Sequence, residues 1–403
     1  MAEDRGTLRA ISWFEVFPGL RLFSALRLAL RFRALLLAAA ALVLVSAGWH
    51  ATGWLFSDSS NEVLRQHIAA NDSWPWDDPI VAPSLGELLS PADWREQSPL
   101  LIAWQQMTAP FSAMFDPGIT FTQFAYLLTG SLWSLLVWAL FGGAISRQAA
   151  MMFSRQENVS WKQLIRFVVP RWPAYFVAPL FPIGGVFLMA ASLALVGLLL
   201  RSGAGLLVAG IFWWLVLFVG FLMAFLLLGL FFGWPLMWGT ISAEGTDSFG
   251  ALSHSYSYVY QRPLQYLLYA TSAAVIGWLG WYLVSLFTLW IIDLSDWGVS
   301  WGSTAVGLRE AVTASESGTM AGYGAQLIRF WTSCLFMLVT AFLISYLWSA
   351  TTVIYFLLRR LVDGVELDEV FTPEERALHS LPPLKTGADG VSEPADEPEG
   401  ARQ

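Results

Sequence analysis

Long apolar runs alternate with short polar connections along this chain. The longest run extends from Leu206 to Trp234 and contains no charged side chain. About 20 apolar residues are enough for a helix to cross the hydrocarbon core of a bilayer. The pattern therefore predicts an all-α fold, a polytopic transmembrane helical bundle with about six spans. The expected spans are approximately 34–56, 123–146, 174–200, 206–234, 264–292 and 328–358.

Composition supports a membrane protein. Hydrophobic residues make up 56% of the 403 residues and charged residues only 13%, whereas a soluble domain carries about 25% charged residues. The chain has 22 Trp residues, and several fall near expected span ends, where an indole suits the headgroup region. The net charge of −8 gives no basic face of the kind that binds nucleic acid, so no nucleic-acid partner is expected.

The distribution of basic residues predicts the orientation. Arg21, Arg27, Arg31 and Arg33 precede the first span, which is too long for a signal peptide and lacks a small-residue cleavage site. With the N-terminus inside, 17 of the 22 Lys and Arg residues lie on the inner side, and the outer side has 5 of them against 13 acidic residues. The positive-inside rule thus predicts a multi-pass protein of the cytoplasmic (inner) membrane with both termini in the cytoplasm.

Three parts are expected along the chain. Residues 1–33 form a cytoplasmic segment with an interfacial helix at 12–33, unless this stretch is only the cytoplasmic end of a long first helix. Residues 34–361 form the six-span domain, with extracytoplasmic loops at 57–122 and 293–326. In the first loop a helix at 99–108 is expected to rest on the outer face of the bundle. Residues 362–403 form an acidic cytoplasmic tail that is largely disordered, because beyond about residue 380 no apolar period remains.

Two cytoplasmic connections share one plan. Each begins with a helix-capping residue, Ser160 in the first and Thr246 or Asp247 in the second. Each continues as two to three turns of amphipathic helix and ends in a basic residue close to a proline that starts the next span. We expect both to be short elbow helices along the inner membrane surface, and they hint at a duplicated span–elbow–span unit.

One polar stripe on the second elbow is a candidate site. Asp247, His254 and Tyr258 fall on roughly one helical face, and with Arg262 they form an inner-interface polar stripe suited to a lipid phosphate. The alternative is an interfacial helix that simply shows water its polar side.

Recognisable catalytic chemistry is not found. The four histidines and the single Cys334 have no metal-ligand spacing, and no nucleophile elbow, Walker loop or dinucleotide fingerprint occurs. We therefore predict no catalytic, cofactor-binding or metal-binding residues, and no cofactor. Spans two to five contain no Asp, Glu, Lys, Arg or His, which argues against a proton-coupled pump. The stretch Pro179–Gly185 either breaks span three, as in transporters, or forms a tolerated kink.

Three segments carry a family resemblance: ISAEGTDSFGALSHSYSYVYQRP (Ile241–Pro263), FPGLRLF (Phe17–Phe23) and YFLLRRLVDG (Tyr355–Gly364). They resemble segments of uncharacterised six-span bacterial membrane proteins, notably from planctomycetes. Spans joined by Ala- and Ser-containing elbows are also similar to the membrane domain attached to some glycerophosphodiester phosphodiesterases. That domain is not the catalytic part of those enzymes, so the resemblance implies no catalytic residues.

These observations favour an integral membrane protein without enzymatic activity, acting as a structural or accessory subunit or as a lipid-contacting one. A transporter or channel is the alternative, favoured by six spans and the Pro/Gly stretch in span three. A lipid-acting membrane enzyme is the second alternative, with His254 and Asp247 as its candidates. Membrane lipids are the expected partners, and a protein partner or a homo-oligomer stays open.

Overall fold

The computed structural model of the protein describes residue 15 and residues 17–57, 61–77, 99–116, 118–302, 319–372, 384–386 and 392–394. Within these ranges six helical segments are long and apolar enough to cross a membrane. They are α3 (Phe32–Leu55), α7 (Phe121–Ser154), a composite segment (Trp161–Leu199), α12 (Trp213–Glu244), α14 (Pro263–Ser300) and α16 (Met320–Asp363). The predicted all-α, six-span bundle is confirmed, and the chain is a multi-pass membrane protein.

Shorter elements connect these segments. The composite segment contains α8 (Trp161–Val168), η2 (Val169–Arg171), α9 (Trp172–Val177) and α10 (Leu180–Leu199). The others are η1 (Pro18–Leu22), α2 (Phe23–Ala29), α4 (Glu62–Asn71), α6 (Pro99–Ala113), α11 (Gly203–Ile211) and α13 (Ser248–Gln261). In the tail, the described strands β1 (Leu384–Thr386) and β2 (Ser392–Pro394) pair antiparallel, although most of that tail lies outside the described residues.

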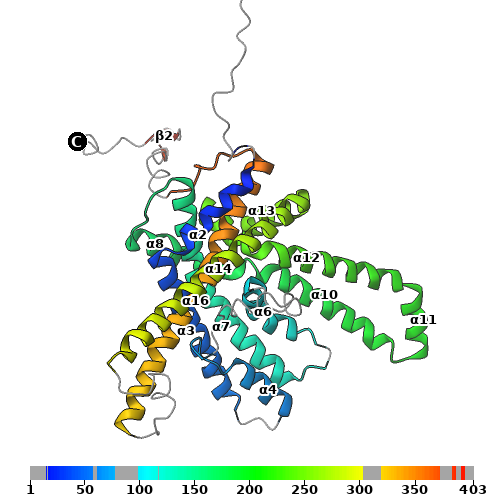
Figure 1. The fold of residues 1–403 in the computed structure, drawn as a ribbon. Coiled ribbons are helices and arrows are strands. Elements are labelled where there is room, and N and C mark those ends of the chain that lie inside the picture. Colours follow the sequence, from blue (N-terminus) through cyan, green and yellow to red (C-terminus); the bar gives the residue numbers. More distant parts are fainter. Residues whose placement is uncertain are drawn as a thin grey trace, which may run out of the picture.

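The helices gather at one end and diverge toward the other (Figure 1). We call the gathered end the elbow end: α3 begins there, α7, α12 and α16 finish there, and α8, α13 and α2 lie across it. From it, α10, α11 and α12 project as one arm, α14 and α16 as a second, and α3 with α7 and α4 as a third. The opposite end, where α4 lies, is called the loop end.

Helix α16 is the centre of the gathered half. Its residues from Val339 to Leu358 are nearly all buried, and it packs against α2, α3, α7, α12 and α14. Polar side chains on α16 find backbone partners on its neighbours: Ser345 Oγ donates to Ala29 O (3.1 Å) and Tyr346 OH donates to Ala273 O (2.7 Å). These bonds satisfy groups that would otherwise be orphaned away from water.

Reciprocal glycine–tryptophan contacts join α3 and α7. A Cβ added at Gly48 would lie 1.8 Å from Trp133 Cδ1, and one added at Gly130 would lie 2.2 Å from Trp49 Cζ3. Trp133 Nε1 also donates to Leu44 O at 2.8 Å. Small residues in membrane helices allow backbones to approach closely, and here each glycine accepts the indole of the facing helix.

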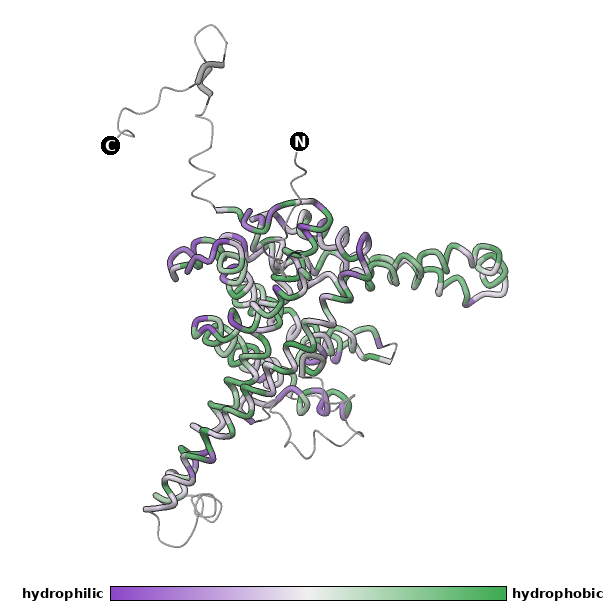
Figure 2. The backbone as a smooth tube through the Cα atoms, turned by 45° about the horizontal axis from the view of Figure 1, so that its top comes forward, coloured by the Kyte–Doolittle hydropathy of each residue, from purple (hydrophilic) through white to green (hydrophobic). Residues whose placement is uncertain are grey.

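The arm formed by α10 and α12 has an apolar outer surface. Figure 2 shows this arm as predominantly hydrophobic along its length. Leu188, Leu195, Leu217 and Phe221 are all largely exposed on it. Exposed apolar surface of this extent suits a hydrocarbon environment.

The two elbows form as expected. Ser160 caps α8 in a capping box with Gln163, and Asp247, rather than Thr246, caps α13 by accepting from Gly250 N at 2.8 Å. At the N-terminus, Arg31 is extended and separates α2 from α3. The described part of 12–33 is therefore a distinct helix and not the end of a long first one. Its buried side chains pack against α14 and α16.

Two details differ from expectation, and the structure decides between the two alternatives given for the third span. The fourth span begins at Trp213, because Phe212 leaves helical geometry and 203–211 forms α11. The third span is interrupted at Ala178–Pro179, where α9 ends and α10 begins; both residues stay near α-helical geometry, so the interruption is a kink.

Helix α6 was expected on the outer face of the bundle, and that expectation is wrong. It packs against α7, α14 and α16, and Trp104 contacts Trp234 of α12 with ring centroids 5.2 Å apart. Trp234 precedes the last residue of α12, Glu244, by ten positions, about 15 Å along the helix at 1.5 Å per residue. This depth lies well inside the bundle, and Figure 1 shows α6 between the arms.

Candidate functional site

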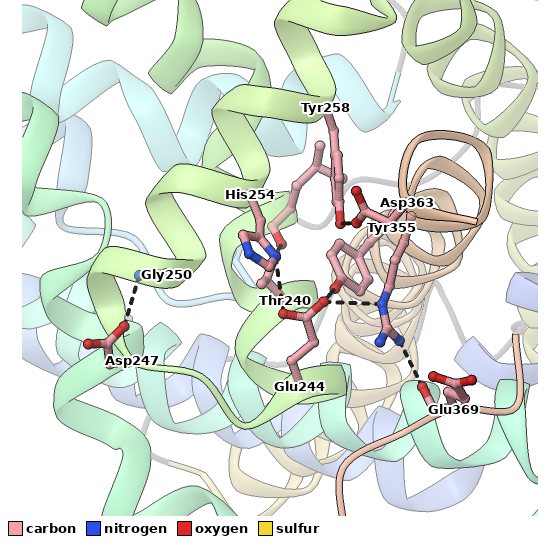
Figure 3. Close-up of polar contacts among 11 residues, drawn as sticks. Thr240, Glu244, Asp247, Gly250, His254, Tyr258, Tyr355, Asp363 and Glu369 are labelled. Atoms are coloured by element: carbon pink, nitrogen blue, oxygen red, sulfur yellow. Dashed lines mark hydrogen bonds and ion pairs between the residues drawn. The ribbon is translucent and has the colours of Figure 1, made fainter. Parts of the chain in front are cut away.

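A pocket of about 590 Å³ opens at the elbow end, where α12, α13 and α16 meet the segment that follows α16. Three basic and three acidic side chains line it, together with four apolar ones. The lining residues are Arg155, Ala243, Glu244, His254, Arg359, Asp363, Val365, Glu369, Val370 and Phe371. Figure 3 shows the polar contacts around it.

The ends of helices α12 and α16 position two of the acidic side chains that line the pocket. Helix α12 ends at Glu244 because Gly245 adopts a left-handed conformation (φ 65°), and α16 ends at Asp363 because Gly364 does the same (φ 70°). Glycine tolerates this conformation without steric cost and commonly terminates helices. A Cβ at Gly245 would also lie 2.5 Å from Phe371, so the turn and the packing of Phe371 depend on the same glycine.

Glu244 is the hub of the polar network. Its carboxylate accepts a short hydrogen bond from Tyr355 OH and lies 3.1 Å from Arg359 Nε. His254 Nδ1 lies 3.1 Å from the other carboxylate oxygen, and the two groups form an ion pair whenever the imidazole is protonated. One carboxylate thus joins α12 to α13 and α16.

The second elbow contributes His254 and Tyr258 to the network. The contact of His254 with Glu244 raises the pKa of His254, whereas burial lowers it. The charge of Asp363 raises this pKa further, and the charge of Arg359 lowers it. Tyr258 is buried and donates a short hydrogen bond to Asp363. Burial and this carboxylate together raise the pKa of Tyr258, so it stays protonated and acts as a donor.

The segment after α16 is held by three arginines. Arg147 Nη2 donates to Phe371 O (2.8 Å), Arg155 Nη2 to Val370 O (3.2 Å) and Arg359 Nη1 to Glu369 O (2.8 Å). We call residues 364–372 the strap, because it crosses the ends of α7 and α12 and forms one wall of the pocket. Its Phe371 N–H donates to Ala243 O at 2.8 Å.

Arg147 is the buried anchor of the strap. It is 4% exposed, and its Nη1 donates to Ser242 O at 2.7 Å, so one guanidinium joins α12 and the strap. Its guanidinium carbon lies 3.8 Å from the ring centroid of Phe167 on α8. The planar guanidinium group of arginine can donate in two directions and stack on an aromatic ring, whereas the ammonium group of lysine cannot.

The predicted stripe is only partly assembled. His254 and Tyr258 belong to the network, whereas Asp247 lies apart from it and caps its own helix (Figure 3). Arg262 is exposed at the end of α13, and its side chain has no partner within the part of the chain described.

Sequence reasoning missed Glu244, Tyr355, Arg359 and Asp363. The signal available for three of them was a charged side chain at the end of an apolar run. Nothing local indicated that the two helix ends that carry them, those of α12 and α16, meet.

In the described ranges no group of three His, Cys, Asp or Glu side chains is placed to hold a metal ion. The site offers charge pairs and hydrogen-bonding groups.

Comparison with known proteins gives no relative: the chain matches no protein-family model, no curated protein sequence and no solved structure. The resemblance to six-span bacterial proteins therefore stays a prediction. What the fold establishes is a multi-pass membrane protein with a charged pocket at the elbow end of its apolar helices.

Proposed function

We propose that this protein is a non-enzymatic, lipid-contacting subunit of the cytoplasmic membrane that binds a zwitterionic phospholipid headgroup in the elbow-end pocket. The observation that carries the proposal is the pocket lining, in which Arg155, His254 and Arg359 face Glu244, Asp363 and Glu369. A phospholipid with a phosphate and an ammonium group complements both signs of charge. The pocket lies at the ends of the apolar helices α12 and α16, and the proposal places a headgroup there.

The orientation in this proposal places the elbow end in the cytoplasm. The basic residues near the starts and ends of the spans at that end support it, since Lys and Arg accumulate on the cytoplasmic side. Reporter fusions test it: alkaline phosphatase fused after Gln403 is expected to be inactive, and inserted after Trp301 it is expected to be active.

Native mass spectrometry of the gently extracted protein tests headgroup binding. We expect the wild type to retain stoichiometric phosphatidylethanolamine, and His254→Gln combined with Asp363→Asn to lose most of it. Asp247→Asn is the matched control, because it changes an acid on the same elbow outside the pocket and asparagine also caps helices. Equal lipid retention in all three proteins would refute headgroup binding in the pocket. A stoichiometric protein partner in place of lipid would favour an accessory subunit.

A transporter or channel is a second candidate, favoured by the insertion of α6 between the arms. Segments that enter a bundle from a loop often line a pathway through it. Solute flux into liposomes that is abolished by Trp104→Ala would favour this function.

A lipid-acting enzyme is favoured by the pairing of His254 with Glu244, because a carboxylate that orients an imidazole is a common general-base arrangement. The original acidic candidate, Asp247, does not contribute to this pair. Turnover of a phospholipid by the purified protein, lost in His254→Gln, would support this alternative.

A further inference from the structure

Five basic side chains lie on α2, on α3, between these two helices and on α8, and none of them lines the pocket. We call them the basic corner: Arg27 on α2, Arg31 between α2 and α3, Arg33 on α3, and Lys162 and Arg166 on α8. Arg27, Lys162 and Arg166 are exposed, and Arg31 and Arg33 are partly exposed.

Two contacts bring the parts of the basic corner together. Arg31 Nη1 donates a short hydrogen bond to Asn158 Oδ1, and Arg33 Nη1 donates to Val159 O at 2.6 Å. The Arg33 guanidinium also lies 5.5 Å from the ring centroid of Trp161, the first residue of α8. The start of α3 is thereby joined to the loop that leads into α8.

The positive charge of this corner has no acidic side chain in contact with it in the described ranges. Among the residues that the structure describes, none of the five cations contacts a carboxylate. Arg31 Nε is buried without a hydrogen-bond partner. Burial lowers the pKa of Arg31, and repulsion by the nearby charges of Arg27 and Arg33 lowers it further. An anion at this position would relieve the repulsion.

Apolar side chains flank the cations and face outward. Phe32 is 74% exposed, Ile165 57%, Leu30 51% and Trp161 41%. Cations beside outward-facing apolar groups at the end of membrane spans match both parts of a phospholipid, since the phosphate meets the guanidinium groups and the acyl chains meet the apolar ones. A free anion or a nucleic acid would use only the charged half of this surface.

We infer that the basic corner is a binding site for an anionic phospholipid, with Arg27, Arg31 and Lys162 receiving the headgroup phosphate and Phe32 and Ile165 contacting the acyl chains. This inference extends the proposed lipid-contacting function to a second surface with a different headgroup preference. Basic surfaces beside the cytoplasmic ends of membrane helices recognise anionic lipids by the same chemistry.

The test compares dioleoyl-phosphatidylglycerol with dioleoyl-phosphatidylcholine, added in equal amounts to the delipidated full chain, by native mass spectrometry. We expect phosphatidylglycerol to bind in excess, and Arg27→Gln with Arg31→Gln to reduce that excess roughly five-fold per charge removed, the equivalent of about 1 kcal/mol each. Lys162→Gln with Arg166→Gln, which breaks no hydrogen bond of the described structure, should act in the same direction. Arg201→Gln, an exposed cation at the far end of α10, is the matched control and should change nothing.

Three results would overturn the inference. Equal binding of the two lipids removes the anionic preference. A preference that survives both double variants places the site elsewhere. Complete competition by millimolar inorganic phosphate assigns a free-anion site in place of a lipid site. Failure of the pocket proposal is distinguishable, because it is measured with phosphatidylethanolamine and with variants of His254 and Asp363, none of which belongs to the basic corner.

Discussion

At the scale of single residues, the elbow end depends on a few side chains that each join several elements. Glu244 contacts groups from α13 and α16, and Arg147 contacts α8, α12 and the strap. Removing one member of such a group leaves buried polar atoms without partners, which costs more than the bond itself contributed. Substitutions at these positions should therefore have effects well beyond those at exposed charges.

His254 should stabilise the protein in a pH-dependent way. Its pKa is raised in the folded protein above the ordinary value of 6.5, so its contribution is fully present below about pH 6.5 and is lost as the pH rises through the folded pKa. Glu244, Asp363, Arg359 and Tyr258 face it. We expect His254→Gln to lower the thermal unfolding midpoint in detergent at about pH 6 and to have little effect at about pH 9. A difference that is the same at both pH values would show that the ion pair contributes nothing.

Arg147→Gln should release the strap. It removes the hydrogen bond from a charged donor to Phe371 O of the strap, so we expect backbone amides of residues 364–372 to exchange with deuterium roughly 30-fold faster, the equivalent of about 2 kcal/mol. Arg147→Lys should rescue little, because an ammonium group lacks the planar fork that reaches both Ser242 O and Phe371 O. Arg166→Gln is the exposed control. Unchanged exchange in Arg147→Gln would mean that the strap is held by other contacts.

At the scale of elements, helix ends and capping follow local sequence closely. Ser160 and Asp247 cap the elbows, and Gly245 and Gly364 terminate α12 and α16. These features depend on residues within one helical turn, which is why the elbows could be predicted. The start of α12 could not, because apolar residues continue through the interruption at Phe212 and hydropathy does not register a change of backbone direction.

The α3–α7 pair gives a prediction at this scale. Gly48→Ala should destabilise the protein by about 1–3 kcal/mol, the usual range for overpacking, because its Cβ would overlap Trp133, whose indole is fixed by a hydrogen bond to Leu44 O. Gly197→Ala on α10 is the control, since nothing lies within 4 Å of the added Cβ and alanine favours helix. Thermal unfolding in the same detergent should separate the two variants. Equal midpoints would contradict the packing described for α3 and α7.

At the scale of the whole molecule, the arms diverge and α6 fills space between them. Ala103, Met107 and Phe111 of α6 pack in the same apolar cluster as Trp138 and Trp348. A helix from the long loop thus becomes part of the bundle interior. This arrangement explains why α6 is apolar although it belongs to an otherwise acidic connection.

Cross-linking tests the position of α6. In a Cys334→Ala background, Trp104→Cys and Trp234→Cys should be joined efficiently by a short bifunctional thiol reagent, because the two indole centroids are 5.2 Å apart. Trp104→Cys with Trp301→Cys is the control pair, since Trp301 follows the loop end of α14. If α6 rested on the outer face of the bundle, the first pair would not cross-link and the experiment would refute the insertion.

The six spans, the elbows and the asymmetry of basic residues could be read from the sequence, because span length, capping and charge are properties of neighbouring residues. Which helix ends meet became clear only from the three-dimensional fold. His254 pairs with Glu244 ten residues earlier and, through it, with Arg359 more than a hundred residues later. Trp104 of α6 likewise contacts Trp234 of α12, which lies far away in the sequence. Helix α12 is apolar on every side, so no amphipathic face indicates its neighbours. In a membrane, the arrangement of helices beside one another follows from close packing of small residues and from a few polar contacts. The hydropathy pattern of the sequence does not contain this arrangement.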